Sequence, residues 1–250
     1  MATAVGVLLL GVGAAASAAP VVNWTLVAAR PHATDAFTEG LVANRGTLLE
    51  STGLEGSSSL RRVDPRTGRV LSRVAVPSNA FGEGMTVLLG TIWQVTWRDH
   101  RIYGYAPSTL RRRSDRRYPF EGWGLTDDGR SLIASDGSST LRWIDPKTLT
   151  VRRSVDVTDD AQPVRNLNEL EMIDGAIWAN VWMTDRIAII DPSNGHVRAW
   201  IDLSPLDPLP ADREAVLNGI TVDPVTRLPL VTGKRWPRMF VIRPEGPIPA

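Results

Sequence analysis

Hydrophobic and polar residues alternate in short runs along almost the whole chain after residue 20, and no longer stretch shows a helical period. Examples of these runs are residues 60–63, 70–74, 132–134 and 187–190. Turn-forming sequences separate the runs, such as DPRTG at 64–68 and DPSNG at 191–195. Short alternating runs between tight turns predict an all-β protein made of hairpins.

A short motif opens each unit of this pattern and recurs every 40 to 48 residues. Its five centres are Gly40, Gly84, Gly124, Glu171 and Gly219. A proline turn recurs with a similar spacing, at 64–65, 106–107, 145–146 and 191–192. Because four-stranded propeller blades take about 40–50 residues each, the two periods predict a five-bladed β-propeller. A β-sandwich is the alternative, but it needs no such repeat.

The predicted propeller occupies residues 20–250 as one domain. Residues 21–30 precede the first repeat. We expect them to supply the outer strand of the last blade and so to close the ring.

Residues 2–19 carry no charge, and an apolar stretch at 5–12 leads to small residues that end at Ala19. This composition predicts a signal peptide at residues 1–19 and an exported protein, secreted or periplasmic. No Lys or Arg precedes the apolar stretch, so a retained anchor helix or a misplaced start codon stays open as the alternative.

The overall composition narrows the classes of partner and site. The 250 residues include 28 Lys or Arg and 27 Asp or Glu, a net charge of +1 that gives no general attraction to nucleic acid or anionic lipid. Cysteine is absent, which excludes disulfides, Cys-ligated metals and a cysteine nucleophile. Three scattered histidines, His32, His100 and His196, indicate surface or packing roles. We expect a monomer that binds neither nucleic acid nor, once the leader is removed, a membrane.

The repeated motif also predicts where a site forms, because the inner strand of each blade lines the central channel of a propeller. Acidic, amide and aromatic side chains would meet at the channel mouth, namely Phe37, Thr38, Glu39, Phe81, Glu83, Phe120, Glu121, Trp123, Asn166, Asn168, Glu169, Glu171 and Asn218. Several carboxylates in one narrow space repel each other unless they bind something. A structural alternative is that the glycines only allow tight packing around the axis and the carboxylates cap turns.

A series of short strings runs through the chain in this order: FTEGL (37–41), ESTG (50–53), FGEGM (81–85), QVTW (94–97), EGWGLT (121–126), SDG (135–137), LNELE (167–171), ANVW (179–182), IAIIDP (187–192), VLNGI (216–220) and TGKRWP (232–237). Together they resemble the plant-type glutaminyl-peptide cyclotransferases, which occur in plants and bacteria. The combination of LNELE and TGKRWP is not a generic propeller sequence.

The resemblance implies a five-bladed propeller that converts N-terminal glutaminyl residues of peptides and proteins to pyroglutamate and releases ammonia. It implies no cofactor and no catalytic metal, and it leaves open a structural divalent cation in the channel. By matching strings, Glu83 is implied as the acid/base residue, with Lys234 and Asn168 at the side-chain amide of the substrate. The implied walls of the substrate pocket are Phe37, Glu39, Phe81, Trp97, Trp123 and Trp182.

The chemistry of this reaction suits the residue types. The α-amine attacks the γ-carbonyl of the same residue, so the protein mainly has to hold the folded-back conformer. One carboxyl, Glu83, can move a proton from the amine to the departing nitrogen, and ring walls would raise its pKa. Lys234 and Asn168 are suitable donors for the oxygen that gains charge.

Two other classes of protein remain as hypotheses. A non-catalytic propeller that binds partner proteins on its rim would show a large exposed apolar patch and would need no lysine in the channel mouth. A metal-dependent lactonase or lyase propeller commonly has six or seven blades, and the count of five units disfavours it. The arginine-rich stretch at 111–117 is interrupted by Asp115 and predicts a surface hairpin.

Overall fold

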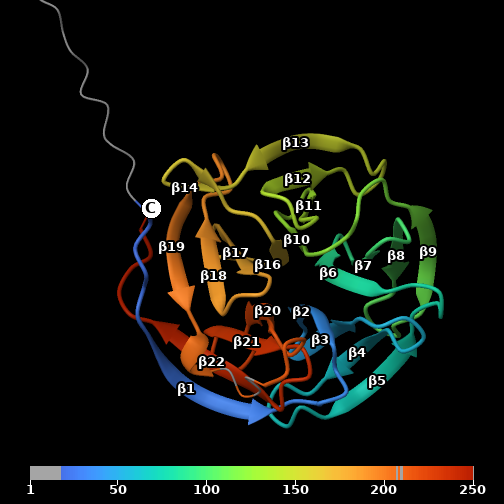
Figure 1. Cartoon of the computed structure of the whole chain (residues 1–250). Helices are drawn as coiled ribbons and strands as arrows, with labels where there is room; N and C mark the ends of the chain where they lie inside the picture. Colours follow the sequence, from blue (N-terminus) through green and yellow to red (C-terminus); the bar gives the residue numbers. More distant parts are fainter. Residues whose placement is uncertain (1–17, 207, 209–210, 250) are drawn as a thin grey trace, which may run out of the picture.

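Five four-stranded antiparallel sheets stand around a central axis as the blades of a propeller (Figure 1). This computed structural model describes residues 18–206, 208 and 211–249, so the predicted signal peptide lies outside the described residues except at its last two positions. Within each of the first four blades, consecutive strands run from the axis outwards. The prediction of an all-β, five-bladed propeller is confirmed.

The strand bounds follow the repeat predicted from the sequence. The first two blades contain β2 (Thr38–Asn44), β3 (Thr47–Thr52), β4 (Ser59–Val63) and β5 (Val70–Ala75), then β6 (Gly82–Leu88), β7 (Thr91–Thr96), β8 (Arg101–Tyr105) and β9 (Arg112–Arg117). The third and fourth contain β10 (Leu125–Asp127), β11 (Leu132–Ala134), β12 (Thr140–Ile144) and β13 (Val151–Asp156), then β16 (Leu167–Ile173), β17 (Ala176–Val181), β18 (Arg186–Ile190) and β19 (Val197–Asp202). The fifth contains β20 (Leu217–Val222), β21 (Pro229–Gly233), β22 (Arg238–Pro244) and β1 (Trp24–Pro31).

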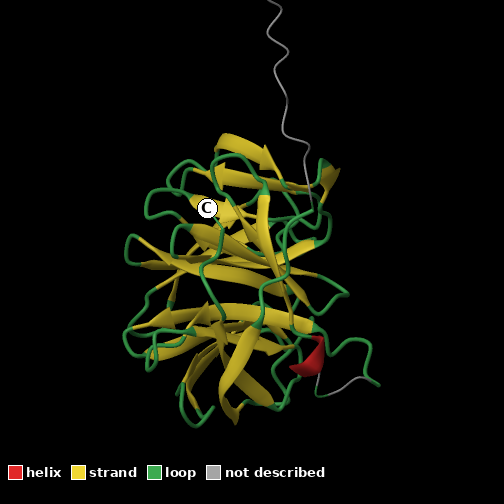
Figure 2. Cartoon of the chain, turned by 90° about the vertical axis from the view of Figure 1, so that its left-hand side faces the viewer, coloured by secondary structure: helices red, strands yellow, loops and turns green. Residues whose placement is uncertain are grey.

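Two small elements lie outside the blades. A hairpin of β14 (Thr158–Asp159) and β15 (Gln162–Pro163) precedes the fourth blade. A 3₁₀ turn, η1 (Ser204–Leu206), follows that blade and is drawn in red in Figure 2. Within the described ranges, no helix has the length and apolar character needed to cross a membrane.

The N-terminal strand closes the ring, as the sequence predicted. β1 pairs antiparallel with β22, from Trp24 opposite Pro244 to Pro31 opposite Arg238. Just before it, the backbone amide of Val22 donates to the carbonyl of Trp200 in β19 at 2.7 Å. The first segment of the chain therefore hydrogen-bonds to the fourth blade and completes the fifth. Because the chain continues from β1 directly into β2, it joins the fifth blade to the first and closes the ring.

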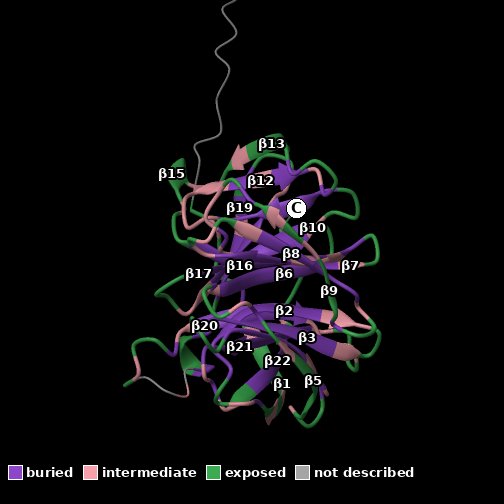
Figure 3. Ribbon diagram, turned by 90° about the vertical axis from the view of Figure 1, so that its right-hand side faces the viewer, coloured by how far each residue is buried: buried purple, intermediate pink, exposed green. Residues whose placement is uncertain are grey.

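The hydrophobic core lies between neighbouring blades, and the outermost strands are polar. Figure 3 shows buried residues concentrated in the inner strands. Trp178 of β17 packs with residues of the fifth blade and is fully buried. By contrast, β9 is exposed along most of its length, and its Asp115 accepts hydrogen bonds from Arg101 of β8. The arginine-rich stretch is therefore a surface strand, as predicted.

The inner strands approach each other very closely at the axis. A Cβ atom on Gly84 would lie only 2.6 Å from Cα of Gly124, and one on Gly40 only 2.8 Å from the amide nitrogen of Met85. Real Cβ atoms do not come this close to backbone, so these positions require glycine. The close approach leaves room for few side chains on the axis.

In the fourth blade, the residue at the centre of the repeated motif differs from the one predicted from the sequence. In β20 the pairing with β21 shifts between Leu217 and Ile220, on either side of Asn218 and Gly219. In β16 the same shift lies between Leu167 and Leu170. The residue of the fourth blade that corresponds to Gly219 is therefore Glu169, and the assignment of Glu171 to this position was wrong by two residues.

Glu169 crosses the axis and joins three blades. Its Oε1 accepts a hydrogen bond from the amide of Leu41 in β2 at 3.2 Å, and its Oε2 accepts one from the amide of Ile220 in β20 at 2.9 Å. We call the face where the inner strands begin the upper face, and the face where they end the lower face. The Glu169 side chain is buried and separates the two mouths of the channel on these faces.

Candidate active site

Each blade places one residue at an equivalent position around the upper mouth. These positions come directly before the close approach of the inner strands, at Glu39, Glu83, Trp123, Asn168 and Asn218. Two acids, two amides and an indole from five separate parts of the sequence therefore share one mouth of the channel, as the repeated motif predicted.

Glu39 lies at the centre of a buried charge network. Its Oε1 accepts a hydrogen bond from Nζ of Lys234 at 2.8 Å, and its Oε2 accepts one from Nδ2 of Asn218 at 2.9 Å. Burial raises the pKa of the Glu39 carboxyl, while the Lys234 ammonium and the Asn218 amide act against that rise. Because both oxygens face donors, the geometry favours the ionised carboxylate paired with Lys234.

Glu83 is the acid whose pKa is raised more strongly than that of Glu39. Burial raises its pKa well above the usual value, and the negative charge of the neighbouring Glu39 raises it further. Lys234 acts in the opposite direction but is already paired with Glu39. Two carboxyl groups that share a site cannot both ionise easily, so the charge of Glu39 holds the pKa of Glu83 above its ordinary value.

Aromatic rings form the walls next to these charges. The Lys234 ammonium lies 4.7 Å from the ring centroid of Phe37, which meets Phe81 edge to face at 6.1 Å. Phe81 in turn meets Trp97 at 5.7 Å. On the opposite part of the mouth, Trp123 and Trp182 meet edge to face at 5.6 Å. These rings lower the local dielectric constant and offer flat surfaces to a ligand.

Several buried polar atoms at the upper mouth have no hydrogen-bond partner within the described part of the chain. They are Oε2 of Glu83, Oδ1 of Asn168, Oδ1 of Asn218 and Nε1 of Trp123. A folded protein rarely leaves such atoms unpaired, because each costs about 1–3 kcal/mol. Acceptors and a donor gathered around one mouth therefore indicate a site for a small polar ligand.

The comparisons with known proteins agree with this geometry. The family model described as glutamine cyclotransferase matches residues 1–243 of the chain. This chain belongs to that family. It is 42% identical over 224 residues to a glutaminyl-peptide cyclotransferase of Arabidopsis thaliana, and the match covers 87% of this chain and 70% of that protein.

Solved structures give the same relationship at the level of the family and the fold. The crystal structure of Myxococcus xanthus glutaminyl cyclase superposes with a TM-score of 0.84 and 35% identity, over 90% of this chain and 98% of that one. The WD40 β-propeller domain of Doa1 gives a TM-score of 0.51 and 12% identity, over 84% of this chain and 64% of that one, which shows the fold alone. The identification as a member of the glutaminyl cyclase family is therefore confirmed.

The structure brings most of the predicted site residues into one connected group. Contacts join Glu39 to Lys234, Lys234 to Phe37, Phe37 to Phe81 and Phe81 to Trp97. The charge of Glu39 raises the pKa of Glu83, and the amide of Gly84 donates to the carbonyl of Trp123 at 2.7 Å. Trp182 lies at the rim with 38% of its surface exposed, and Asn168 is buried at the equivalent position of the fourth blade.

The sequence analysis misplaced one acid. Glu171 was expected at the same mouth, but it points to the lower face, where it accepts a hydrogen bond from Thr221 at 3.1 Å. There it lines a cavity of about 820 Å³ together with Asn44, Thr86, Asp127 and Trp143. This cavity lies at the other end of the channel from the unpaired atoms of Glu83, Asn168, Asn218 and Trp123.

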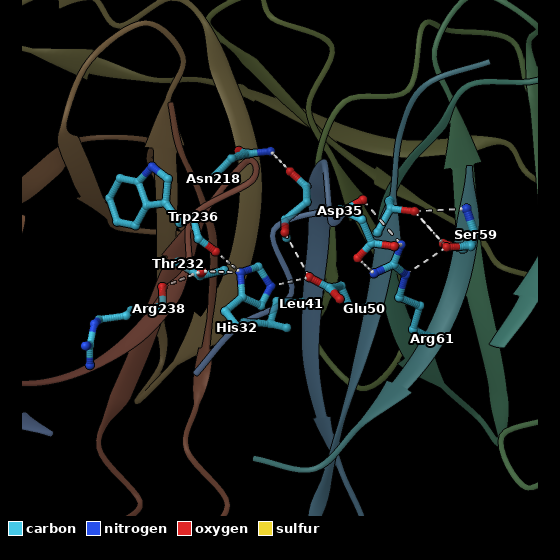
Figure 4. A network of polar contacts seen from close by, with 12 residues as sticks. His32, Asp35, Leu41, Glu50, Ser59, Arg61, Asn218, Thr232, Trp236 and Arg238 are labelled. Carbon is cyan, nitrogen blue, oxygen red and sulfur yellow. Dashed lines mark hydrogen bonds and ion pairs between the residues drawn. The ribbon is translucent and has the colours of Figure 1, made fainter. Parts of the chain in front are cut away.

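Three contributors to the site were missed or given no role. Asn218 holds Glu39, and it also donates to the carbonyl of Thr38 at 3.0 Å. His32 and Glu50 form a buried ion pair beneath the same segment (Figure 4). A signal was available for Glu50, since it begins the ESTG string, but no local pattern links it to His32. Among the residues the structure describes, no group of three or more His, Asp or Glu side chains is arranged to hold a metal ion.

Proposed function

We propose that this protein converts the N-terminal glutaminyl residue of peptides and proteins to pyroglutamate and releases ammonia. In this reaction a bond forms between the substrate α-nitrogen and its own δ-carbon, and the bond from that carbon to the amide nitrogen breaks. One proton moves from the attacking nitrogen to the departing one. Nucleophile and electrophile are tethered in a single residue, so no covalent enzyme intermediate and no cofactor is required.

Glu83 moves the proton. Its pKa, raised by burial and by the charge of Glu39, brings the carboxyl towards the protonation balance that a residue acting first as base and then as acid needs near neutral pH. Its Oε2 is buried and has no partner among the described residues, so it is available to a substrate nitrogen. This unpaired oxygen, on a buried carboxyl whose pKa is raised by burial and by the charge of Glu39, is the observation that carries the proposal.

Lys234 and Asn168 act on the substrate amide. The Lys234 ammonium has three N–H donors, and its bond to Glu39 uses one of them. The remaining donors, with the amide N–H of Asn168, stabilise the oxygen that becomes negative when the amine attacks. One such donor is typically worth about 3–4 kcal/mol of the barrier. Trp97, Trp123 and Trp182 hold the planar ring of the product.

The test is mass spectrometry of a Gln-Xaa peptide incubated with the purified protein. Loss of one ammonia from the peptide is the expected result. The same peptide with an acetylated α-amine must stay intact, because its nitrogen cannot attack. An unchanged Gln-Xaa peptide would contradict the proposal and would favour a propeller that only binds partner proteins.

We also propose that the protein is exported as a monomer, to the periplasm or the medium, after cleavage near Ala19. The support is the uncharged, apolar segment that ends in small residues. N-terminal sequencing of protein recovered outside the cytoplasm should begin close to Pro20. A chain that keeps Met1 and sediments with membranes would instead indicate a retained anchor.

A further inference from the structure

His32 lies directly after β1 and is enclosed by three other segments of the chain (Figure 4). Its Nδ1 is 2.7 Å from the carbonyl oxygen of Trp236, and its Nε2 is 2.7 Å from Oε1 of Glu50. Only 1% of either side chain of the His32–Glu50 pair is exposed. Neither partner can therefore exchange its contact for water without a local opening.

The partners of the ring show which of its nitrogens carry protons. A carbonyl oxygen only accepts, so the contact with Trp236 requires a proton on Nδ1. Oε1 of Glu50 accepts a hydrogen bond from Oγ1 of Thr38 at 2.8 Å, and the pKa of this carboxyl is lowered, so as a carboxylate it also accepts from Nε2. Both ring nitrogens then donate, and His32 is an imidazolium paired with a carboxylate.

The electrostatics agree with this assignment. Burial alone would lower the pKa of His32, but the charge and the hydrogen bond of Glu50, with the Trp236 carbonyl, outweigh it and raise the pKa. The pKa of Glu50 is lowered, because His32, Arg61 and Thr38 together overcome the effect of its burial. The other charged group that faces the pair is Arg61 of β4, which is itself held by Asp35.

The pair joins the two segments that carry the central ion pair of the proposed site. Trp236 follows Lys234 by two residues, and Thr38 directly precedes Glu39. Two backbone hydrogen bonds reinforce the link, from His32 to Pro237 at 2.9 Å and from Arg235 to Ala36 at 2.7 Å. The position of Lys234 relative to Glu39 thus depends on what happens at His32.

We propose that His32, held as an imidazolium between Glu50 and the Trp236 carbonyl, is a positioning residue that keeps Lys234 on Glu39. It does not touch the substrate. The ring has a third polar contact, because Nδ1 also lies 3.2 Å from Oγ1 of Thr232. When the ring loses its proton, only one of its two nitrogens still donates, and the Glu50 carboxylate is left buried without its counter-ion. The Lys234 turn is then released from the start of β2. This inference rests on the proposed function for its effect on turnover, but not for its effect on protonation or on Lys234.

The protonation state can be read directly by nitrogen-15 NMR of histidine-labelled protein. The chain has three histidines, so the variants His100→Asn and His196→Asn assign the His32 ring by elimination. We expect both ring nitrogens of His32 to be protonated at pH 7. A neutral ring with a single protonated nitrogen at that pH would overturn the proposal.

The position of Lys234 can be followed by acetic anhydride labelling and mass spectrometry. Lys234 and Lys147 are the two lysines of the chain, and the exposed Lys147 serves as an internal reference. In the wild type, labelling of Lys234 relative to Lys147 should rise at the pH where the His32 ring titrates. If Lys234 labelling shows no step at that pH, the coupling does not exist. This measurement needs neither a variant nor catalytic activity.

The effect on turnover is tested with E50Q, which keeps the shape of the side chain and removes its charge. Because an adjacent opposite charge typically shifts a pKa by about 1–3 units, the alkaline limb of kcat/KM should move to lower pH by about that amount. His196→Asn on the lower face should leave the profile unchanged. Superimposable profiles of E50Q and the wild type would overturn the positioning role. A wild type without cyclase activity would refute the proposed function alone, since the NMR and labelling results still decide the state and role of His32.

Discussion

The two mouths of the central channel are both lined with acids, but they differ in how those acids are satisfied. At the lower mouth, Asp127 accepts hydrogen bonds from Thr86 and from the amide of Gly129, and Glu171 accepts one from Thr221. At the upper mouth, Glu83 keeps an unpaired oxygen, and burial together with the charge of Glu39 raises its pKa. Acids that are satisfied locally stabilise a turn, whereas acids left coupled and unpaired are free to do chemistry.

The presence of a cavity does not by itself identify the mouth at which the reaction takes place. The lower mouth opens into a cavity of about 820 Å³, and Trp143 and Arg153 stack at its wall with 3.8 Å between guanidinium and ring centroid. Its single unpaired buried atom is Oδ1 of Asn44 among the residues described. We therefore assign the chemistry to the upper mouth on charge coupling and unpaired atoms rather than on volume.

The largest predicted difference between the two mouths is in kcat, when one acid at each mouth is replaced by glutamine. E83Q removes the proton-transfer group, and kcat should fall by about 10²–10⁴-fold, the usual contribution of a general acid or base. The melting temperature should change little, because Gln has the same shape. E171Q is the matched control at the lower mouth, and it should keep the wild-type rate. Comparable rates for E83Q and wild type would remove Glu83 from the mechanism.

Variants of the Lys234–Glu39 ion pair can test its contribution to catalysis separately from its contribution to stability. K234M should lower kcat/KM by about 10²–10³-fold, since an oxyanion donor is lost. It should also destabilise the fold by about 3–5 kcal/mol, because Glu39 stays buried without its cation. The double variant E39Q/K234M should regain much of that stability without regaining activity, as denaturant unfolding and peptide assays would show. Recovery of both properties together would mean that Lys234 acts only on the fold.

We expect a smaller effect, on the free energy of unfolding, from replacing Glu169 on the axis between the two mouths. Glu169 binds the amides of Leu41 and Ile220, and E169Q can accept with only one side-chain oxygen. One buried amide then loses its partner, so the free energy of unfolding should drop by about 1–3 kcal/mol. Guanidinium unfolding of E169Q beside E171Q measures the difference. If both substitutions lower the free energy of unfolding equally, the contacts of Glu169 at the axis contribute no more to stability than those of Glu171.

At the lower mouth, we expect Glu171 to affect mainly the pH dependence of the free energy of unfolding. Burial and the charge of Asp127 raise the pKa of Glu171 from its ordinary value of 4.5 to about 8, although hydrogen bonds act against this rise. Between these values the folded chain holds a proton that the unfolded chain has lost, so stability falls as the pH rises through this window. The slope from one such group is at most about 1.4 kcal/mol per pH unit. Unfolding at pH 5 to 8 should show a shallower decline for E171Q, and parallel curves would contradict the raised pKa.

Some of this architecture was predictable because it is local. The alternation of apolar and polar residues and the recurring turns depend on neighbours in the sequence, so the count of five blades and the closing role of residues 21–30 were correct before any coordinates. Most of the mouth residues also followed, since every blade enters its inner strand in the same way. Glu83, Trp123 and Asn218 could be placed from the period alone.

The fourth blade shows where that reasoning fails. The string LNELE offers two glutamates two residues apart, and both fit a period that varies between 40 and 48 residues. Only the pairing of β16 with β17 shows that Glu169 enters the axis and Glu171 faces the lower mouth. A register shift is defined by how two strands pair, so the sequence of one strand alone does not reveal it.

By itself, then, the sequence determined the repeat, the number of blades and the kinds of side chain that face the upper mouth. The tertiary structure decided which of these groups are charged, because that depends on burial and on partners from distant segments. His32 meets the Trp236 carbonyl across 204 residues of chain, and Lys234 meets Glu39 across 195. Closing the ring brings these groups together, and the exclusion of water then sets their protonation.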